Sequence, residues 1–286
     1  MKTYSTVSNV DTLDSLYSDI ISFILRKGED VADRTRCFFN DNKLMVPVFK
    51  PVNIKAVAAE LYCFINGIKG FGCNWWEGNL QDANKRWGTP DNRDLGPVYG
   101  VQWIKPFYKN GVLTNQLKDV IETLKVKPTD RRAYITAWNP QEMDAMALPP
   151  CYHGFQLFIN NRNELELMFH MRSADVILGL PHDILLHQML QITIAAELGV
   201  GVGDMTVTLG DYHIYQNHID AAKIFLQRIV SNSDTTLDTN FFGTAAGRPD
   251  INAIYDVSVF DFTPADVAPM VEKYKPMPNI KLQMAV

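Results

Sequence analysis

Four segments of the chain are expected to be helical, and in three of them apolar residues recur at helical spacing on one face. The segments run from Leu13 to Ile24, from Ile54 to Asn66, from Leu117 to Leu124 and from Ile184 to Leu198. The last is apolar on nearly every side, so we expect a buried central helix there. Each segment is followed by a residue that commonly ends a helix: Gly28, Gly67, Pro128 and Gly199.

Short runs rich in β-branched and aromatic residues indicate strands elsewhere. They cover residues 133–138, 154–160, 164–170, 205–210 and 256–262, and a polar "NRN" turn separates the second run from the third. No repeat, linker or low-complexity segment divides the sequence. We therefore expect one α+β domain over residues 1–286.

Between Phe71 and Gly100 neither pattern holds. Trp75, Trp76 and Trp87 stand there among Gly, Asn, Asp and Pro residues. An irregular segment of this length is more often functional than idle, so we expect a loop that serves a site.

The overall composition excludes several classes of protein. The 286 residues are 47% hydrophobic and 21% charged with a net charge of −5, so we expect no general attraction to nucleic acid. No apolar run approaches the roughly 18 residues of a membrane span, and no signal-type apolar core begins the chain, so we expect a cytoplasmic protein without membrane association. The four cysteines have irregular spacing that predicts reduced thiols and no metal site: Cys37, Cys63, Cys73 and Cys151.

One of these cysteines stands in an unusual setting. Pro149 and Pro150 precede Cys151 and restrict the backbone on its N-terminal side. A nucleophilic thiol must be held still and needs nearby positive charge, for which Arg172 and the pair Arg131–Arg132 are candidates. The alternative is an ordinary buried cysteine, which residue type alone favours.

Two carboxylates are further candidates. Glu60 falls on the apolar face of the helix expected at Ile54–Asn66, where it is either an edge residue reaching water or a proton-transfer group with a raised pKa. Asp183 precedes an apolar helix and suits an N-cap. His182, His213 and His218 lack the spacing of a metal site, so we expect no bound metal.

Six motifs resemble those of the thymidylate synthase family, in order and across nearly the whole chain. They are "DLGPVYG" (Asp94–Gly100), "DRRAYITAWNP" (Asp130–Pro140), "MALPPC" (Met146–Cys151), "RSADVILGLP" (Arg172–Pro181), "GDYHIYQNH" (Gly210–His218) and the terminal "IKLQMAV". The resemblance implies a large mixed β-sheet packed by helices, and a homodimer formed sheet to sheet. It also implies a pyrimidine nucleoside monophosphate as substrate and 5,10-methylenetetrahydrofolate as cosubstrate.

The resemblance carries roles onto matching positions of this sequence. Cys151 matches the nucleophile that adds to C6 of the pyrimidine, Glu60 the carboxylate that organises water and proton transfers, and Tyr99 the tyrosine that assists proton removal at C5. The positions that match substrate ligands are Arg34, Arg172 and Ser173 for the phosphate, Arg131 and Arg132 donated by the partner subunit, and His213 and Tyr215 for the sugar 3′-hydroxyl. The positions that match the folate side are Leu148, Asp175, Gly179 and the terminal Ala285–Val286.

Several positions depart from the family pattern. Thymidylate-forming members have asparagine where this chain has Asp183, and histidine where it has Tyr152. They usually have an aromatic residue, stacked on the folate, where His182 stands. Met171 replaces a glutamine that neighbours the substrate, and "RTRCFF" replaces the glycine-rich phosphate loop after Arg34.

Asp183 favours cytosine over uracil. A protonated carboxyl can donate to N3 of cytosine and accept from its 4-amino group, whereas an asparagine amide complements uracil. Loss of the family histidine at Tyr152, on the O4 side, favours the same base. We expect a deoxycytidylate 5-hydroxymethyltransferase, because cytosine-selecting members mostly add water to the C5 methylene. The alternatives are dCMP 5-methyltransferase, CMP 5-hydroxymethylase, thymidylate synthase acting on dUMP, and an inactive relative that binds nucleotide or regulates translation.

Overall fold

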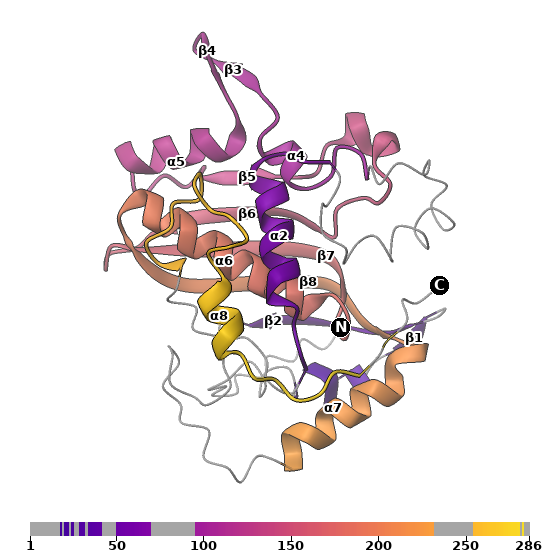
Figure 1. The fold of residues 1–286 in the computed structure, drawn as a ribbon. Helices are drawn as coiled ribbons and strands as arrows, with labels where there is room; N and C mark the ends of the chain where they lie inside the picture. Colours follow the sequence, from indigo (N-terminus) through magenta and orange to yellow (C-terminus); the bar gives the residue numbers. More distant parts are fainter. Residues whose placement is uncertain are drawn as a thin grey trace.

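The computed structural model describes residues 18, 20–22, 24–25, 29–31, 34–41, 50–69, 95–231, 254–280 and 282, with the backbone alone at 29–41 and 229–231 (Figure 1). The expected tryptophan loop, most of the expected first helix and the terminal Ala285–Val286 lie outside these ranges.

A six-stranded mixed sheet forms the centre of the described structure. Its strands follow the order β1 (Glu29–Val31), β2 (Arg34–Asp41), β8 (Gly201–Tyr215), β7 (Glu164–Asp175), β6 (Tyr152–Ile159) and β5 (Tyr134–Thr136). Only β7 and β8 pair in parallel; the other neighbours in this sheet are antiparallel. The crossover between β7 and β8 is helix α6 (Leu180–Leu198), as a parallel pair requires.

Helices cover one face of this sheet. In Figure 1, α6 lies over the central strands, with α2 (Ile54–Ile65) and α8 (Ala268–Lys273) beside it. The remaining elements are α4 (Gly100–Trp103), a hairpin of β3 (Phe107–Lys109) and β4 (Val112–Thr114), α5 (Gln116–Val126), η1 (Pro140–Ala145), η2 (Gln216–His218) and α7 (Ile219–Ser231). None of the helices described is long and apolar enough to cross a membrane.

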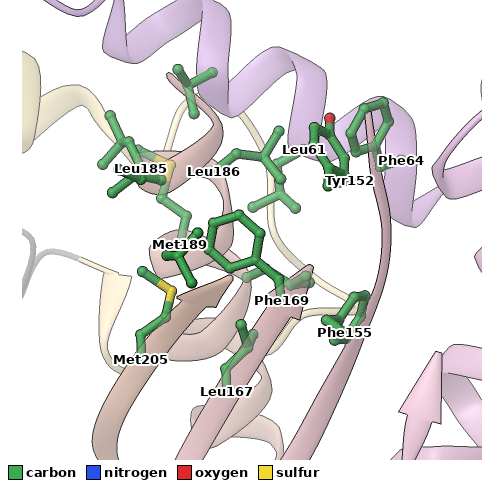
Figure 2. Packing of buried hydrophobic residues seen from close by; sticks show 14 of the residues in the cluster. Leu61, Phe64, Tyr152, Phe155, Leu167, Phe169, Leu185, Leu186, Met189 and Met205 are labelled. Carbon is green, nitrogen blue, oxygen red and sulfur yellow. The ribbon is translucent and has the colours of Figure 1, made fainter. Parts of the chain in front are cut away.

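Alternation along the strands builds the core. In β7 the side chains of Leu165, Leu167, Phe169 and Met171 are buried, and the positions between them are not. The buried side chains of β7 meet α6, which has fourteen buried residues, and Figure 2 shows Leu186 and Met189 packed over Phe169. Truncating one such phenylalanine to alanine costs about 3–5 kcal/mol.

The opposite face of the sheet carries exposed side chains in this single chain. Tyr134, Phe158 and Met168 are 39%, 36% and 36% exposed and come from β5, β6 and β7. Large apolar side chains clustered on one surface are typical of an interface.

The expected helices and strands are largely found. Residues 54–66 and 117–124 match α2 and α5, and 184–198 falls within α6, which ends at Gly199 with a positive φ of 66°. The first helix is described at six positions, all helical. The strand expected at 256–262 is wrong: the segment forms turns. Val259 and Phe262 are buried three residues apart, and Val259 N donates to Thr193 O of α6, so the segment packs as turns rather than pairing as a strand.

Candidate active site

Cys151 is held by hydrogen bonds on both sides of its backbone. Its N–H donates to the hydroxyl of Tyr99 at 3.1 Å, and its carbonyl accepts from Arg172 N at 2.8 Å. The residue lies just before β6 and is half-buried. The Cys151 backbone, expected from the two prolines to be held firmly, is thus bonded to Arg172 on β7 and to Tyr99 in the turn before α4.

The Arg172 side chain adds a clamp on the same loop. Its Nε donates to Pro150 O at 2.9 Å, and one Nη donates to Pro149 O at 2.7 Å. The guanidinium carbon also lies 6.0 Å from the ring centre of Trp138. One exposed arginine thus positions three consecutive residues of the loop that carries the thiol.

Burial raises the pKa of the Cys151 thiol, and the charge of Arg172 opposes that rise. The negative charges of Asp183 and Asp175 raise it further. Of the sequence candidates, Arg172 is the one whose charge lowers the pKa of this thiol, and its role in activating a nucleophile remains a prediction. The thiol is mainly protonated in the free chain at neutral pH.

Tyr99 joins the thiol to α2. Its φ of 44° is rare for a residue with a side chain, and the next residue, Gly100, packs so closely on α2 that a Cβ there would overlap the backbone of Phe64. The Tyr99 ring stacks on Phe64 at 5.3 Å and on Tyr152 at 4.2 Å. Burial raises the pKa of Tyr99 well above its usual value, so it acts as a neutral phenol.

Glu60 lies on the same helix, one turn from Phe64, and is buried at 7% exposure. Its charge raises the pKa of both Tyr99 and Tyr152, which places the carboxylate within electrostatic reach of the two phenols. Of the two readings of Glu60, an edge residue reaching water does not fit this burial, and the proton-transfer role remains a prediction.

Asp183 does not cap α6. The N-cap position is Gly179, no side chain bonds the first amides there, and the Asp183 carboxyl accepts no hydrogen bond among the residues described. Asp175 bonds the turn that leads into the helix, because its Oδ1 accepts from Ile177 N and Leu178 N at 3.0 Å each. The carboxyl of Asp183 is left for another function.

The pKa of Asp183 is raised to about 8. Burial is the main cause, the Asp175 carboxylate adds to it, and the ammonium of Lys50 opposes it. Asp183 and Asp175 flank Gly179, whose built Cβ would lie 3.5 Å from Asp183 Oδ2 and 3.8 Å from Asp175 Cβ. Asp183 is therefore mostly a neutral acid at pH 7 and can donate a hydrogen bond.

The sheet register brings the other predicted substrate residues together. Across the parallel pair, Ser173 faces Asp211 and Asp175 faces His213, and in the antiparallel pair Arg34 faces Tyr215. These positions share the end of β7, β8 and β2 near Arg172. His213 is buried against the Tyr215 ring at 4.8 Å, and its Nε2 has no hydrogen-bond partner in the described structure. A buried, unpaired ring nitrogen of this kind fits a ligand hydroxyl.

Arg131 and Arg132 lie apart from this group, just before β5. Arg132 pairs with Asp130 through Nε and one Nη at 3.1 and 2.9 Å, which lowers the Asp130 pKa. Both arginines are exposed. In the register of β5 and β6, Thr136 pairs with Gly154 near Cys151, whereas Arg131 and Arg132 precede the other end of β5.

Three of the positions predicted for the folate side lie at or just before the start of α6: Asp175, Gly179 and His182. Leu148 is half-buried, and Gly179 lies between the two aspartates. His182 is buried, with Nδ1 3.0 Å from Leu178 O and Nε2 accepting from Asn53 N at 3.5 Å, so its ring is held between α6 and the N-cap of α2. The described residues contain no group of three or more His, Cys, Asp or Glu side chains that could hold a metal.

Sequence reasoning missed two residues of this region. His187 stacks on Phe169 at 3.9 Å, meets the Tyr152 ring edge-on at 4.9 Å, and has Nδ1 2.7 Å from Asp183 O. Its four-residue spacing from Asp183 on a helix is the signal that finds it. Lys50 is 3% exposed, and its place as a single lysine in an apolar stretch before α2 is the corresponding signal.

Comparison with known proteins identifies the family of the chain. The family model for thymidylate synthase matches residues 15–286. Bifunctional dihydrofolate reductase-thymidylate synthases of Leishmania major and Leishmania amazonensis are each 33% identical over 94% of this chain. The chain spans about half of their length, 55%. Members of the matched family are folate-dependent enzymes that alkylate C5 of pyrimidine nucleotides with methylenetetrahydrofolate as cosubstrate. Because the family model matches nearly the full length of this chain, the chain belongs to the thymidylate synthase family.

Proposed function

We propose that the chain is a deoxycytidylate 5-hydroxymethyltransferase. It would transfer a one-carbon unit from 5,10-methylenetetrahydrofolate to C5 of dCMP through a Cys151–C6 adduct, followed by addition of water. The observation that carries the choice of base is Asp183, a carboxyl that bonds no backbone amide and whose pKa is raised to about 8.

A neutral carboxylic acid complements cytosine. Its O–H donates to N3, and its carbonyl oxygen accepts from the 4-amino group. Uracil offers the reverse pattern at both positions, so it would leave buried polar groups unpaired. A site built on buried hydrogen bonds rejects such a mismatch strongly.

The attack on C6 uses the same acid. Sγ of the Cys151 thiolate forms a bond to C6 while the C5–C6 π pair shifts to C4–C5. The C4–N3 π pair moves to N3, which takes the proton of Asp183. C5 then carries the electron density needed for alkylation, and Arg172 supports the thiolate.

The folate side has groups that suit a pterin. Asp175 keeps Oδ2 free of hydrogen bonds among the residues described, 4.0 Å from His218 Nδ1, so this oxygen can accept from ring or amino N–H groups. The folate supplies the one-carbon unit. Glu60, buried beside Tyr99 and Tyr152, is the group we assign to orienting the water that adds to the C5 methylene.

The test is mass spectrometry of the products formed from dCMP, CMP and dUMP with methylenetetrahydrofolate. Formation of 5-hydroxymethyl-dCMP, with the folate left as tetrahydrofolate, supports the proposal. Formation of one dihydrofolate for each dCMP consumed would show that the enzyme methylates C5 instead of adding water. Efficient turnover of CMP would make the ribonucleotide the substrate. Cys151→Ser is the control: it should abolish turnover and retain nucleotide binding.

Thymidylate formation from dUMP is the second candidate, because the Leishmania relatives carry that name. Asp183→Asn separates the two candidates. If Asp183 selects cytosine, this variant moves the preference from dCMP toward dUMP. Unchanged preference would remove the argument for cytosine and leave dUMP as the substrate.

We also propose a homodimer formed through the uncovered sheet face around Tyr134, Phe158 and Met168, with Arg131 and Arg132 completing the partner's phosphate site. Mixing inactive Cys151→Ser with inactive Arg131→Glu chains should restore up to about a quarter of the activity, because random pairing gives half heterodimers with one intact site each. A monomer in light scattering, or no recovery on mixing under exchange conditions, would contradict this arrangement.

A further inference from the structure

One histidine of α6 lies inside the hydrophobic core. His187 is 1% exposed. Its ring is parallel to the ring of Phe169 on β7, with 2° between the two planes and 3.9 Å between the ring centres. It meets two rings of β6 edge-on, Tyr152 at 4.9 Å and Phe155 at 6.3 Å. Three aromatic rings from two strands thus hold the imidazole in one plane.

The fixed ring directs one of its nitrogens at the first turn of α6. His187 Nδ1 lies 2.7 Å from Asp183 O, four residues earlier on the helix. A carbonyl oxygen can only accept, so Nδ1 carries the hydrogen of this bond. Burial lowers the pKa of His187 to about 4, so the ring is neutral at pH 7. The contact therefore selects one tautomer, with the proton on Nδ1 and none on Nε2.

Packing alone does not require a histidine at this position. A phenylalanine could make the same three ring contacts without burying a polar ring, which carries a cost in free energy. What a phenylalanine cannot make is the hydrogen bond to Asp183 O. Through this bond and the ring contact, His187 joins Asp183 to Tyr152, which are the two positions that favour cytosine.

We propose that His187 is a positioning residue for base choice, because it holds the backbone of Asp183 in a fixed place relative to Tyr152. The inference rests on the proposed function and deepens it by naming a residue on which the preference for cytosine depends. Donors and acceptors read a base edge only when they stay within about 0.5 Å of their places. His187 acts through Asp183, so its loss should change the preferred base more than the rate of bond formation.

The experiment compares kcat/KM for dCMP with kcat/KM for dUMP in each variant. Both substrates are measured on the same preparation, so a loss of folded protein cancels in the ratio. His187→Phe keeps the stacked ring and removes the donor, and it should lower the preference for dCMP by roughly tenfold, the upper range for the loss of one neutral hydrogen bond. An unchanged ratio would overturn the inference.

His187→Asn separates the hydrogen bond from the packing of the ring. Its amide offers an N–H donor close to the place of Nδ1, so it should recover part of the preference that His187→Phe loses. A ratio no higher than that of His187→Phe would overturn the role of the hydrogen bond.

Thr193→Val is the matched control. Thr193 is also buried in α6, and its Oγ1 donates to Met189 O, four residues earlier. This bond is of the same kind but lies about 15 Å further along the helix axis. The variant should keep the wild-type ratio. A change as large as that of His187→Phe would overturn the inference, because any disturbance of α6 would then alter base choice.

Nitrogen-15 NMR of the free wild-type protein tests the hydrogen bond without substrate. The His187 ring should show a protonated Nδ1 and an unprotonated Nε2 at pH 7. A proton on Nε2, or a charged ring at this pH, would overturn the inference even if His187→Phe does not fold. Failure of dCMP as a substrate would instead count against the proposed function, since this measurement uses no nucleotide.

Discussion

Asp183→Asn should stabilise the free protein, and by an amount that depends on pH. The folded state holds the Asp183 proton with a pKa of about 8, against 3.8 as the usual value for the unfolded chain. A folded pKa above the unfolded one means that the native state binds more protons between these two values. Stability is therefore lost as the pH rises from about 4 to about 8.

The size of the effect follows from the same two values. Each pKa unit corresponds to about 1.4 kcal/mol, so holding the acid neutral costs up to roughly 4 kcal/mol at pH 7. Asparagine has similar shape and no proton to lose. Since relaxation of the folded state and coupling to Lys50 reduce the value, we expect Asp183→Asn to gain about 2–4 kcal/mol at pH 7.

Urea unfolding between about pH 5 and pH 8.5 measures this gain. The difference in free energy of unfolding between Asp183→Asn and wild type should grow by up to about 1.4 kcal/mol per pH unit and level off above about pH 8. Asp144→Asn is the matched control, because Asp144 is exposed on η1 and should change stability little at any pH.

A difference that stays flat across this range would refute the reasoning, because Asp183 would then ionise alike in both states. A destabilised Asp183→Asn at pH 7 would refute it in another way, by showing that the carboxylate makes favourable contacts in the native chain. Either result would also weaken the assignment of cytosine.

Three further substitutions test the surrounding framework. Tyr99→Phe removes the acceptor for the Cys151 amide and should lower the free energy of unfolding by about 1–3 kcal/mol in urea titrations, whereas no change would mean that this amide is satisfied otherwise. Arg172→Lys loses the two hydrogen bonds to the carbonyls of Pro149 and Pro150 and holds its charge less firmly near the thiol. The pH profile for alkylation of Cys151 by iodoacetamide should therefore shift to higher pH, and an unshifted profile would contradict Arg172 as the activating cation. Asp175→Asn keeps an oxygen for the two turn amides and removes a charge, so the Asp183 midpoint in carbon-13 NMR should fall, and a rise or no shift would exclude Asp175 as a cause.

Periodic patterns predicted most of the fold because each helix and strand buries one regular set of residues. The helices at α2 and α5 and the long α6 followed directly from apolar spacing and their terminal glycines or prolines. The segment 256–262 was mistaken for a strand because alternating Val, Phe and Asp residues look the same whether they pair or turn. Contact with Thr193 decided the outcome, and this contact is far away in the sequence.

The sequence motifs predicted which residues belong to the candidate site. They did not predict the protonation states or hydrogen-bond partners of those residues, which depend on the three-dimensional surroundings. The sequence offered an N-cap or a base-reading acid for Asp183, and only the three-dimensional contacts show that Asp175 bonds the turn amides instead. Lys50 was missed because its apolar neighbours in the sequence only suggest burial, and the structure is needed to show that its side chain is buried. The roles of all the site residues remain predictions, and for Arg34 and Ala285 the Arg34 side chain and the C-terminus also lie outside the described residues.

The close packing of Gly100 on Phe64 has a consequence for how such a protein can diverge. Because no side chain fits between the two backbones, the helix that carries Glu60 and the turn that carries Tyr99 must keep their relative positions when the sequence changes. Under the proposed function, the first turn of α6 is where variation acts, because an exchange of asparagine for aspartate at position 183 would change the preferred base and leave the residues of bond formation in place. New substrate preferences in this scaffold should therefore arise by few steps and at few positions.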